Sequence, residues 1–189
     1  MSVSAFDPHP FPWTEDEYFA LGETDNRIEL IDGMLLVSPA PRNAHQIISM
    51  MLVRAVFPAV MEAGLIPMEA TNVRLATDRI VIPDVVVADA SFEATVTEAA
   101  DVVLVCEITS PSNAISDRVT KMQLYAAARI EWYLLVEPDA ADPAQITMWL
   151  FRRHGDHYVE YATAKPGGTL TSAEPFPMEI PTDSLVLKR

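Results

Sequence analysis

One run of the chain, DVVLVCEITS at residues 101–110, is apolar at every position from Val102 to Cys106. A strand that protein covers on both faces shows such a continuous run, whereas a half-exposed strand alternates apolar and polar residues. A second run of this kind, EWYLLVEPD, occupies residues 131–139, and a stretch with helical spacing of apolar residues separates the two. These features predict an α/β (α+β) fold, a sandwich in which helices flank a mixed central sheet.

Local signals place the other elements around this sheet. Thr14 and Glu17 can form a capping box, which predicts a helix from Glu15 to Leu21. Asp32-Gly33 suits a type I′ turn because both residues tolerate positive φ, so a hairpin is expected there. Further elements are expected as follows: a helix from Asn43 to Gly64, a hairpin turning at Asp78 with a long second strand bent at Pro83, a helix after Pro111, a hairpin turning at Gly155-Asp156, and extra C-terminal strands.

The spacing of apolar residues also predicts which face each longer helix buries. In the helix that follows Asn43, the predicted buried stripe consists of Ile47, Ile48, Met51, Leu52, Ala55 and Val56. In the helix that follows Pro111, it consists of Val119, Met122 and either Tyr125 or Ala126. Lys121 lies outside this second stripe.

The length of 189 residues suggests one domain, at a prior of roughly 150 residues per domain. We expect a single domain over residues 1–189, with extended segments at residues 1–12 and 164–189. The one cysteine, Cys106, lies in the apolar run and cannot form an internal disulfide. That usage is typical of a reduced protein, so a cytoplasmic location is expected.

The charge balance limits the partners of the chain. There are 13 Lys and Arg residues against 27 Asp and Glu residues, a formal charge of −14, which excludes a uniformly basic nucleic-acid coat. No membrane partner is expected, because Arg54 and Pro58 interrupt the longest hydrophobic stretch. The sequence has no phosphate-loop, dinucleotide-binding, zinc-protease or CxxC signature, so nucleotide hydrolysis, Rossmann redox chemistry and zinc proteolysis lose support.

Two carboxylates stand in apolar strands. Asp84 separates IVIP from VVV, and Glu107 closes the run that begins at Val102. An ionised carboxylate in a covered strand is costly unless a cation or hydrogen bonds compensate it. The two strands are expected to be neighbours, and two converging carboxylates suit a hard cation such as Mg²⁺. Taken singly, an Asx-type turn at Asp84 and an ion pair of Glu107 with an Arg or Lys explain each residue equally well.

Lys121 lies on the helix after Glu107, four residues beyond Asp117. A solvated ion pair with Asp117 is the simpler interpretation of this lysine. In the functional alternative, Lys121 reaches the carboxylates, where its charge could orient a nucleophilic water or stabilise a phosphoryl transition state. In that role Lys121 is expected to affect turnover and to have little effect on stability.

An ordered set of motifs resembles the Uma-two family of restriction-endonuclease-like proteins. The set comprises IELIDG at Ile28–Gly33, His45, IPDVVV at Ile82–Val87, CEITSPSN at Cys106–Asn113, then Asp117, Lys121, Tyr125 and EWYLLVEP. The resemblance implies a PD-(D/E)XK nuclease, with a restriction-endonuclease-like sandwich and Pro83-Asp84 as the PD pair. Glu107 matches the acidic member, and Thr109 stands where ExK would have lysine, so Lys121 takes that role. Glu29 and His45 match further positions of the family pattern and would complete the site.

The function expected from these residues is a metal-dependent endonuclease that hydrolyses phosphodiester bonds in DNA. Asp84, Glu107 and the carbonyl of Ile108 would bind Mg²⁺ (or Mn²⁺), and a double-strand cutter would commonly be a homodimer. The basic residues available to contact DNA are Arg42, Arg54, Arg74, Arg79, Arg118, Lys121 and Arg129. Two alternatives are a catalytically inactive nuclease fold that acts as a protein-interaction or regulatory module, and a metal hydrolase for a small phosphoester. A basic groove beside Asp84 and Glu107 would favour the nuclease, and a plugged or uniformly acidic groove would favour the module. A narrow closed pocket would favour the small-phosphoester hydrolase.

Overall fold

The computed structural model describes residues 11–22, 24, 26–109 and 114–187, and only the backbone of residues 114–118. Its helices are α1 (Glu15–Ala20), α2 (Asn43–Glu62), α3 (Ala114–Ala127) and the short 3-10 turns η1 (Ala99–Asp101) and η2 (Thr182–Leu185). Its strands are β1 (Arg27–Ile31), β2 (Met34–Ser38), β3 (Ile66–Glu69), β4 (Val73–Ala76), β5 (Arg79–Val81), β6 (Val85–Ala88), β7 (Thr97–Glu98), β8 (Val102–Ile108), β9 (Trp132–Pro138), β10 (Ile146–His154), β11 (His157–Ala164), β12 (Thr169–Ser172) and β13 (Met178–Pro181).

The strand that contains Glu107 lies in the interior of a six-stranded sheet of order β11-β10-β9-β8-β6-β3. On one side β8 pairs antiparallel with β6, with Cys106 opposite Val85. On its other side it pairs parallel with β9, with Cys106 opposite Leu134. The sheet is therefore mixed, and the prediction that β6 and β8 are neighbours is confirmed.

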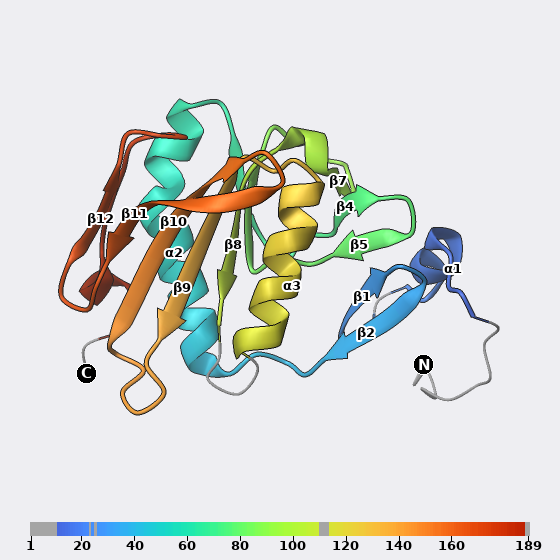
Figure 1. Ribbon diagram of the computed structural model, residues 1–189, viewed down its shortest axis with the longest axis horizontal. Helices are drawn as coiled ribbons and strands as arrows, with labels where there is room; N and C mark the ends of the chain where they lie inside the picture. The colour runs from blue at the N-terminus through green and yellow to red at the C-terminus, as the bar shows by residue number, and fades with distance from the viewer. Residues whose placement is uncertain (1–10, 23, 25, 110–113, 188–189) are drawn as a thin grey trace.

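Both faces of this sheet are covered, as the continuous apolar run requires. On one face Val85, Leu104 and Cys106 share a core with α2 and with β12 and β13. On the other face Val86 and Val105 share a core with α3 and the smaller sheet. Figure 1 shows α3 on the near side of the strands and α2 behind them. The predicted sandwich is confirmed.

A five-stranded sheet of order β2-β1-β5-β4-β7 lies beside α3, at the right of Figure 1. Its β1–β2 hairpin turns at Asp32 and Gly33, whose φ values of 52° and 78° are those of the predicted type I′ turn. The capping box of Thr14 and Glu17 is also formed at the start of α1. These short-range predictions hold because each depends on residues within a few positions of one another.

The long strand predicted after Asp78 is instead two strands in different sheets. Its first part is β5 of the five-stranded sheet, and its second part is β6 of the six-stranded sheet. Pro83 lies in the crossing between them and has no N–H to continue a ladder, so the bend expected there changes the sheet. Strands β3 and β7, which carry no strong alternation, were not predicted.

The buried faces of α2 and α3 each differ from the predicted stripe. Along α2, Ile48, Leu52, Val56 and Val60 form a row spaced by four, and Ala55 falls outside this narrow face and is exposed. On α3, Val119 is 50% exposed, whereas Lys121 is only 8% exposed. The helix is turned so that Lys121 meets buried carboxylates, and an ion pair therefore overrides the apolar pattern.

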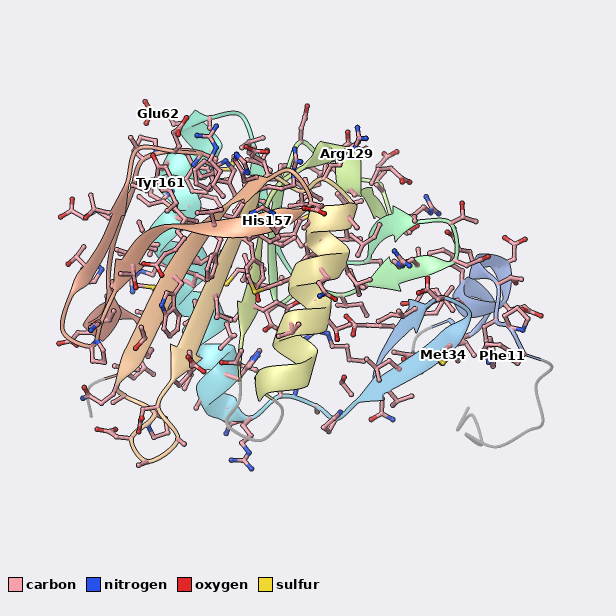
Figure 2. All side chains as sticks on the ribbon, in the orientation of Figure 1. Phe11, Met34, Glu62, Arg129, His157 and Tyr161 are labelled. Carbon is pink, nitrogen blue, oxygen red and sulfur yellow. The ribbon has the colours of Figure 1, made fainter. Side chains whose placement is uncertain are left out.

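Helix α2 is the one described helix that is long and apolar enough to cross a membrane by length and composition. A single helix of this kind is weak support for a span, since core helices satisfy the same criteria. At the C-terminal end, the predicted hairpin turns at Gly155, and β12 and β13 form the extra strands. Figure 2 shows side chains filling the space between the helices and the sheets, with Met34 at the hairpin of the five-stranded sheet.

Candidate functional site

Two carboxylates lie on the α3 side of the large sheet. Side chains alternate between the faces of a strand, and Val86 and Val105 share a core with α3. Asp84 precedes Val86 by two positions and Glu107 follows Val105 by two, so both carboxylates point to this face. They are 6% and 8% exposed. The crossing between the sheets brings Asp84 to the point where the smaller sheet meets β8.

Three groups bind the carboxylate of Asp84. Arg27 Nη1 lies 2.7 Å from Oδ1, and His45 Nε2 lies 3.1 Å from Oδ2. The backbone N–H of Ile108 donates to Oδ2 over 2.7 Å. Burial alone would raise the pKa of Asp84, but His45 and Arg27 more than offset it and hold this pKa well below its usual range. Asp84 is therefore an anion at neutral pH.

Glu107 has a different set of partners, both from α3. Lys121 Nζ lies 3.1 Å from Oε1, and the hydroxyl of Tyr125 donates to the same oxygen. Burial raises the pKa of Glu107 to about 7, with Lys121 acting against this and the charge of Asp84 adding to it. Burial and Glu107 together also raise the pKa of Tyr125, which stays a protonated donor.

Glu29 joins the smaller sheet to α3. Its side chain is 1% exposed, and Oε1 lies 3.2 Å from Lys121 Nζ. The same oxygen accepts the backbone N–H of Ile82 over 2.8 Å. Lys121 therefore bridges Glu29 and Glu107, and Glu29 fixes the chain just before Pro83-Asp84.

The structure thus brings together all five side chains that the sequence singled out, namely Glu29, His45, Asp84, Glu107 and Lys121. Sequence reasoning missed Arg27 and gave Tyr125 no role beyond the core. Two spacings could have indicated them. Arg27 precedes Glu29 by two positions on β1, which puts both on one face, and Tyr125 follows Lys121 by four on α3.

Oxygen atoms at this site suit a hard divalent cation. Asp84 and Glu107 supply carboxylates, and the carbonyl of Ile108 faces the same way as its N–H, which reaches Asp84. Within the described part of the chain, no three His, Cys, Asp or Glu side chains are already gathered as metal ligands. Each carboxylate instead holds a cationic side chain, Arg27 or Lys121. The chemistry of these donors fits Mg²⁺. A bound ion would either share the two carboxylates with Arg27 and Lys121 or displace these side chains from them.

The family model described as "Putative restriction endonuclease" (Uma2) matches residues 15–183 of this chain. That span includes every site residue described above. The chain belongs to the Uma2 family. The resemblance to this family inferred from the motifs is therefore confirmed.

A solved structure supports the fold of this Uma2 protein. It is described as the crystal structure of "a putative nuclease belonging to DUF820" from Anabaena variabilis, and it superposes with a TM-score of 0.72. The match covers 92% of this chain and 97% of that chain at 18% sequence identity. No protein of curated function matches the chain. The structural likeness shows a shared restriction-endonuclease-like fold.

Some of the basic residues expected to contact DNA are already paired with acidic side chains in this Uma2 protein. Arg74 pairs with Glu15 and Glu98, and Arg79 pairs with Asp32. Arg42, Arg54 and Arg129 are exposed, and Figure 2 labels Arg129 beside the end of α3. The side chain of Arg118 lies outside the described part of the chain. The positive charge next to Asp84 and Glu107 comes from Arg27 and Lys121.

A cavity of about 840 Å³ lies away from these residues. Its lining includes Arg74, Glu98, Arg129 and Trp132 and contains neither Asp84 nor Glu107. This cavity therefore gives no support to the alternative of a small-phosphoester hydrolase, which would need its pocket at the carboxylates.

Proposed function

We propose that this Uma2 protein is a metal-dependent endonuclease that hydrolyses phosphodiester bonds in DNA. One observation carries the proposal: Asp84, directly before β6, bonds to the N–H of Ile108 on the neighbouring strand β8, next to Glu107, to which Lys121 is bound. Paired carboxylates beside a lysine are the groups that metal-assisted phosphodiester hydrolysis requires. Membership of the Uma2 family supports a nuclease in particular.

Asp84, Glu107 and the carbonyl of Ile108 would hold Mg²⁺ or Mn²⁺ in this proposal. The ion, when bound, supplies Lewis-acid stabilisation of the phosphate and lowers the pKa of a bound water. The chain positions its own ligands closely. Asp84 is fixed by His45 and by the N–H of Ile108, and Glu107 is fixed by Tyr125.

Lys121 supplies a positive charge that can stay in the site when a metal ion binds. Its ammonium group lies between Glu29 and Glu107 at 3.2 and 3.1 Å. From there it orients the water that attacks phosphorus in line, or stabilises the charge that develops on the phosphate oxygens. Thr109 stands where the simple motif has lysine, and Lys121 reaches Glu107 from the following helix instead.

Cleavage of supercoiled plasmid in the presence of Mg²⁺ or Mn²⁺ tests the proposal. Wild-type protein should nick or linearise the plasmid, and a chelator should stop it. E107Q should lose activity by about 10²-fold or more while keeping its fold, since glutamine keeps the shape of the side chain and burial already raises the pKa of Glu107 to about 7. The matched control is E179Q, a strand glutamate whose side chain is exposed, and it should cleave like wild type.

The inactive-module alternative also has an observation in its favour, because Arg27 and Lys121 already neutralise the two carboxylates. Absence of cleavage on plasmid and oligonucleotide substrates with either metal would support that alternative. Linear product formed without a nicked intermediate would indicate two sites acting together, and hence a homodimer. Size-exclusion chromatography of the same preparation would check the dimer directly.

A further inference from the structure

The sequence did not single out Arg27, which binds Asp84. Only part of its guanidinium is hydrogen-bonded to residues that the structure describes. A guanidinium carries five N–H donors on three nitrogens. Arg27 uses Nη1 to bind Asp84, with its side chain 20% exposed. Its Nε and Nη2 atoms are buried and have no hydrogen-bond partner among the described residues. Two buried nitrogens of this partly exposed side chain therefore lack an acceptor within the described part of the chain.

The carboxylate of Asp84, in contrast, is well supplied with hydrogen-bond donors. It accepts from His45 and from the N–H of Ile108 in addition to Arg27, so it keeps two donors when Arg27 is removed. Leaving buried donors unsatisfied is destabilising, and charged donors cost more than neutral ones. The Arg27–Asp84 pair thus satisfies the carboxylate better than it satisfies the guanidinium.

The free edge of Arg27 has a definite chemical preference. Nε and Nη2 form one side of the planar guanidinium and donate two parallel hydrogen bonds. That fork matches two oxygens of a phosphate group, or of a carboxylate. The carboxylates described around Arg27 are already bonded to other groups, Glu29 to Lys121 and Glu107 to Lys121 and Tyr125. The acceptor that fits is therefore an anion from outside the chain.

We propose that Arg27 holds Asp84 in the metal-free protein and moves to the substrate when a divalent cation takes over that carboxylate. In the loaded state Arg27 binds two non-bridging oxygens of a DNA phosphodiester through Nε and Nη2. This inference rests on the proposed nuclease function and adds a substrate-binding residue to it. Arg27 is thus first a competitor of the metal and then a ligand of the phosphate.

This dual role predicts effects of opposite sign, which a structural role does not. Removing Arg27 removes the competitor at Asp84, so Ca²⁺ should bind more tightly. The same change removes a phosphate ligand, so DNA should bind more weakly. An arginine that only supports the fold of the site would weaken both kinds of binding together.

The experiment compares full-length wild type, R27M, R27K and R153M. Arg153 is the matched control because its side chain is 25% exposed, close to the 20% of Arg27, and it pairs with Glu131 outside the site. Calorimetric titration measures Ca²⁺ affinity, with Ca²⁺ used in place of Mg²⁺ to prevent turnover. Fluorescence anisotropy measures binding of a short labelled duplex to the Ca²⁺-loaded protein at several salt concentrations.

R27M should bind Ca²⁺ about tenfold more tightly and the duplex about tenfold more weakly, with the salt slope reduced by about one. R27K keeps the charge and loses the fork, so its Ca²⁺ affinity should stay near wild type while its DNA affinity falls. R153M should match wild type within about twofold in both titrations. If R27M does not fold, R27K carries the test, since lysine retains the ion pair with Asp84.

Three results would overturn the inference. Equal DNA affinity of wild type and both Arg27 variants would show that the guanidinium does not touch phosphate. Loss of Ca²⁺ affinity in R27M would show that Arg27 supports the metal site and does not compete with it. A wild-type protein that binds neither Ca²⁺ nor duplex would overturn the proposed nuclease function itself, and this inference with it.

Discussion

The two carboxylates of the site, Asp84 just before β6 and Glu107 on the adjacent strand β8, are both buried, yet their pKa values are shifted in opposite directions. Asp84 faces Arg27, His45 and a backbone N–H, and its pKa is lowered. Glu107 faces Lys121 and Tyr125, and its pKa is raised to about 7. Burial disfavours both anions, so the difference comes from the number and kind of donors.

This difference shows how one site can keep Asp84 ionised while Glu107 stays close to the midpoint of its protonation. The sign of each contribution to stability follows from the pKa shift. The contribution of Asp84 is present above its ordinary pKa and is lost as the pH falls. The contribution of Glu107 to stability is full below its ordinary pKa of 4.5. It is lost as the pH rises towards about 7, the pKa of this group in the folded protein. Variants of the two residues should therefore behave differently.

The largest effect is expected for D84N in metal-free protein. This change leaves the buried guanidinium of Arg27 without its anion and weakens the bond to His45, so the free energy of unfolding should fall by about 3 kcal/mol. Urea denaturation in the presence of a chelator measures it. D89N, an exposed position on the same segment, is the control. A D84N protein as stable as wild type would mean that these ion pairs add no net stability.

The next effect is expected for K121M, with a loss of about 2 kcal/mol. The expectation that Lys121 has little effect on stability does not fit its place between two buried carboxylates. The loss is smaller than for D84N because Glu107 can take up a proton near neutral pH. E107Q should stabilise the K121M background more than it stabilises wild type, and K165M, an exposed lysine, should be neutral. An equal gain from E107Q in both backgrounds would contradict the coupling.

A smaller effect, which depends on pH, is expected for E107Q. The glutamine cannot ionise, so without metal the variant should match wild type near pH 4.5 and be the more stable of the two at pH 7.5. Thermal unfolding in matched buffers at the two pH values provides the comparison. A constant difference across this range would show that Glu107 keeps its ordinary pKa in the fold.

The smallest effect is expected for R79M, which removes an ion pair on the surface of the smaller sheet. Asp32 is 58% exposed at its side chain, and such pairs contribute about 0–1 kcal/mol. The free energy of unfolding should change by less than about 0.5 kcal/mol, as urea titration would show. A loss as large as that of D84N would remove the contrast between buried and exposed pairs.

The sequence predicted elements whose signals are local or continuous. The Asp32-Gly33 turn, the capping box of Thr14 and the apolar run of β8 needed no knowledge of distant residues. The resemblance to the Uma-two family named five site residues because the motifs keep their order along the chain. The pairing of β6 with β8 followed from the two apolar runs.

The features that escaped prediction depend on contacts between distant parts of the chain. The change of sheet at Pro83 requires knowing that two sheets exist, since either half of the segment is an acceptable strand. The orientation of α3, which exposes Val119 and buries Lys121, involves an ion pair of Lys121 with Glu29, which lies far away in sequence. Arg27 was missed because an arginine at the start of an exposed-looking strand has no local mark of a buried partner.

The partners of the two carboxylates come from opposite halves of the chain. Asp84 takes both cationic side chains from earlier in the sequence, and Glu107 takes its partners from later. The exposed segment 91–95 separates the halves, which the bond from Lys121 to Glu29, 92 positions apart, joins again. A chain cut within this segment would give two fragments, each with one half of the site. Their reassociation would then be a complementation assay in which metal binding reports that the halves have met.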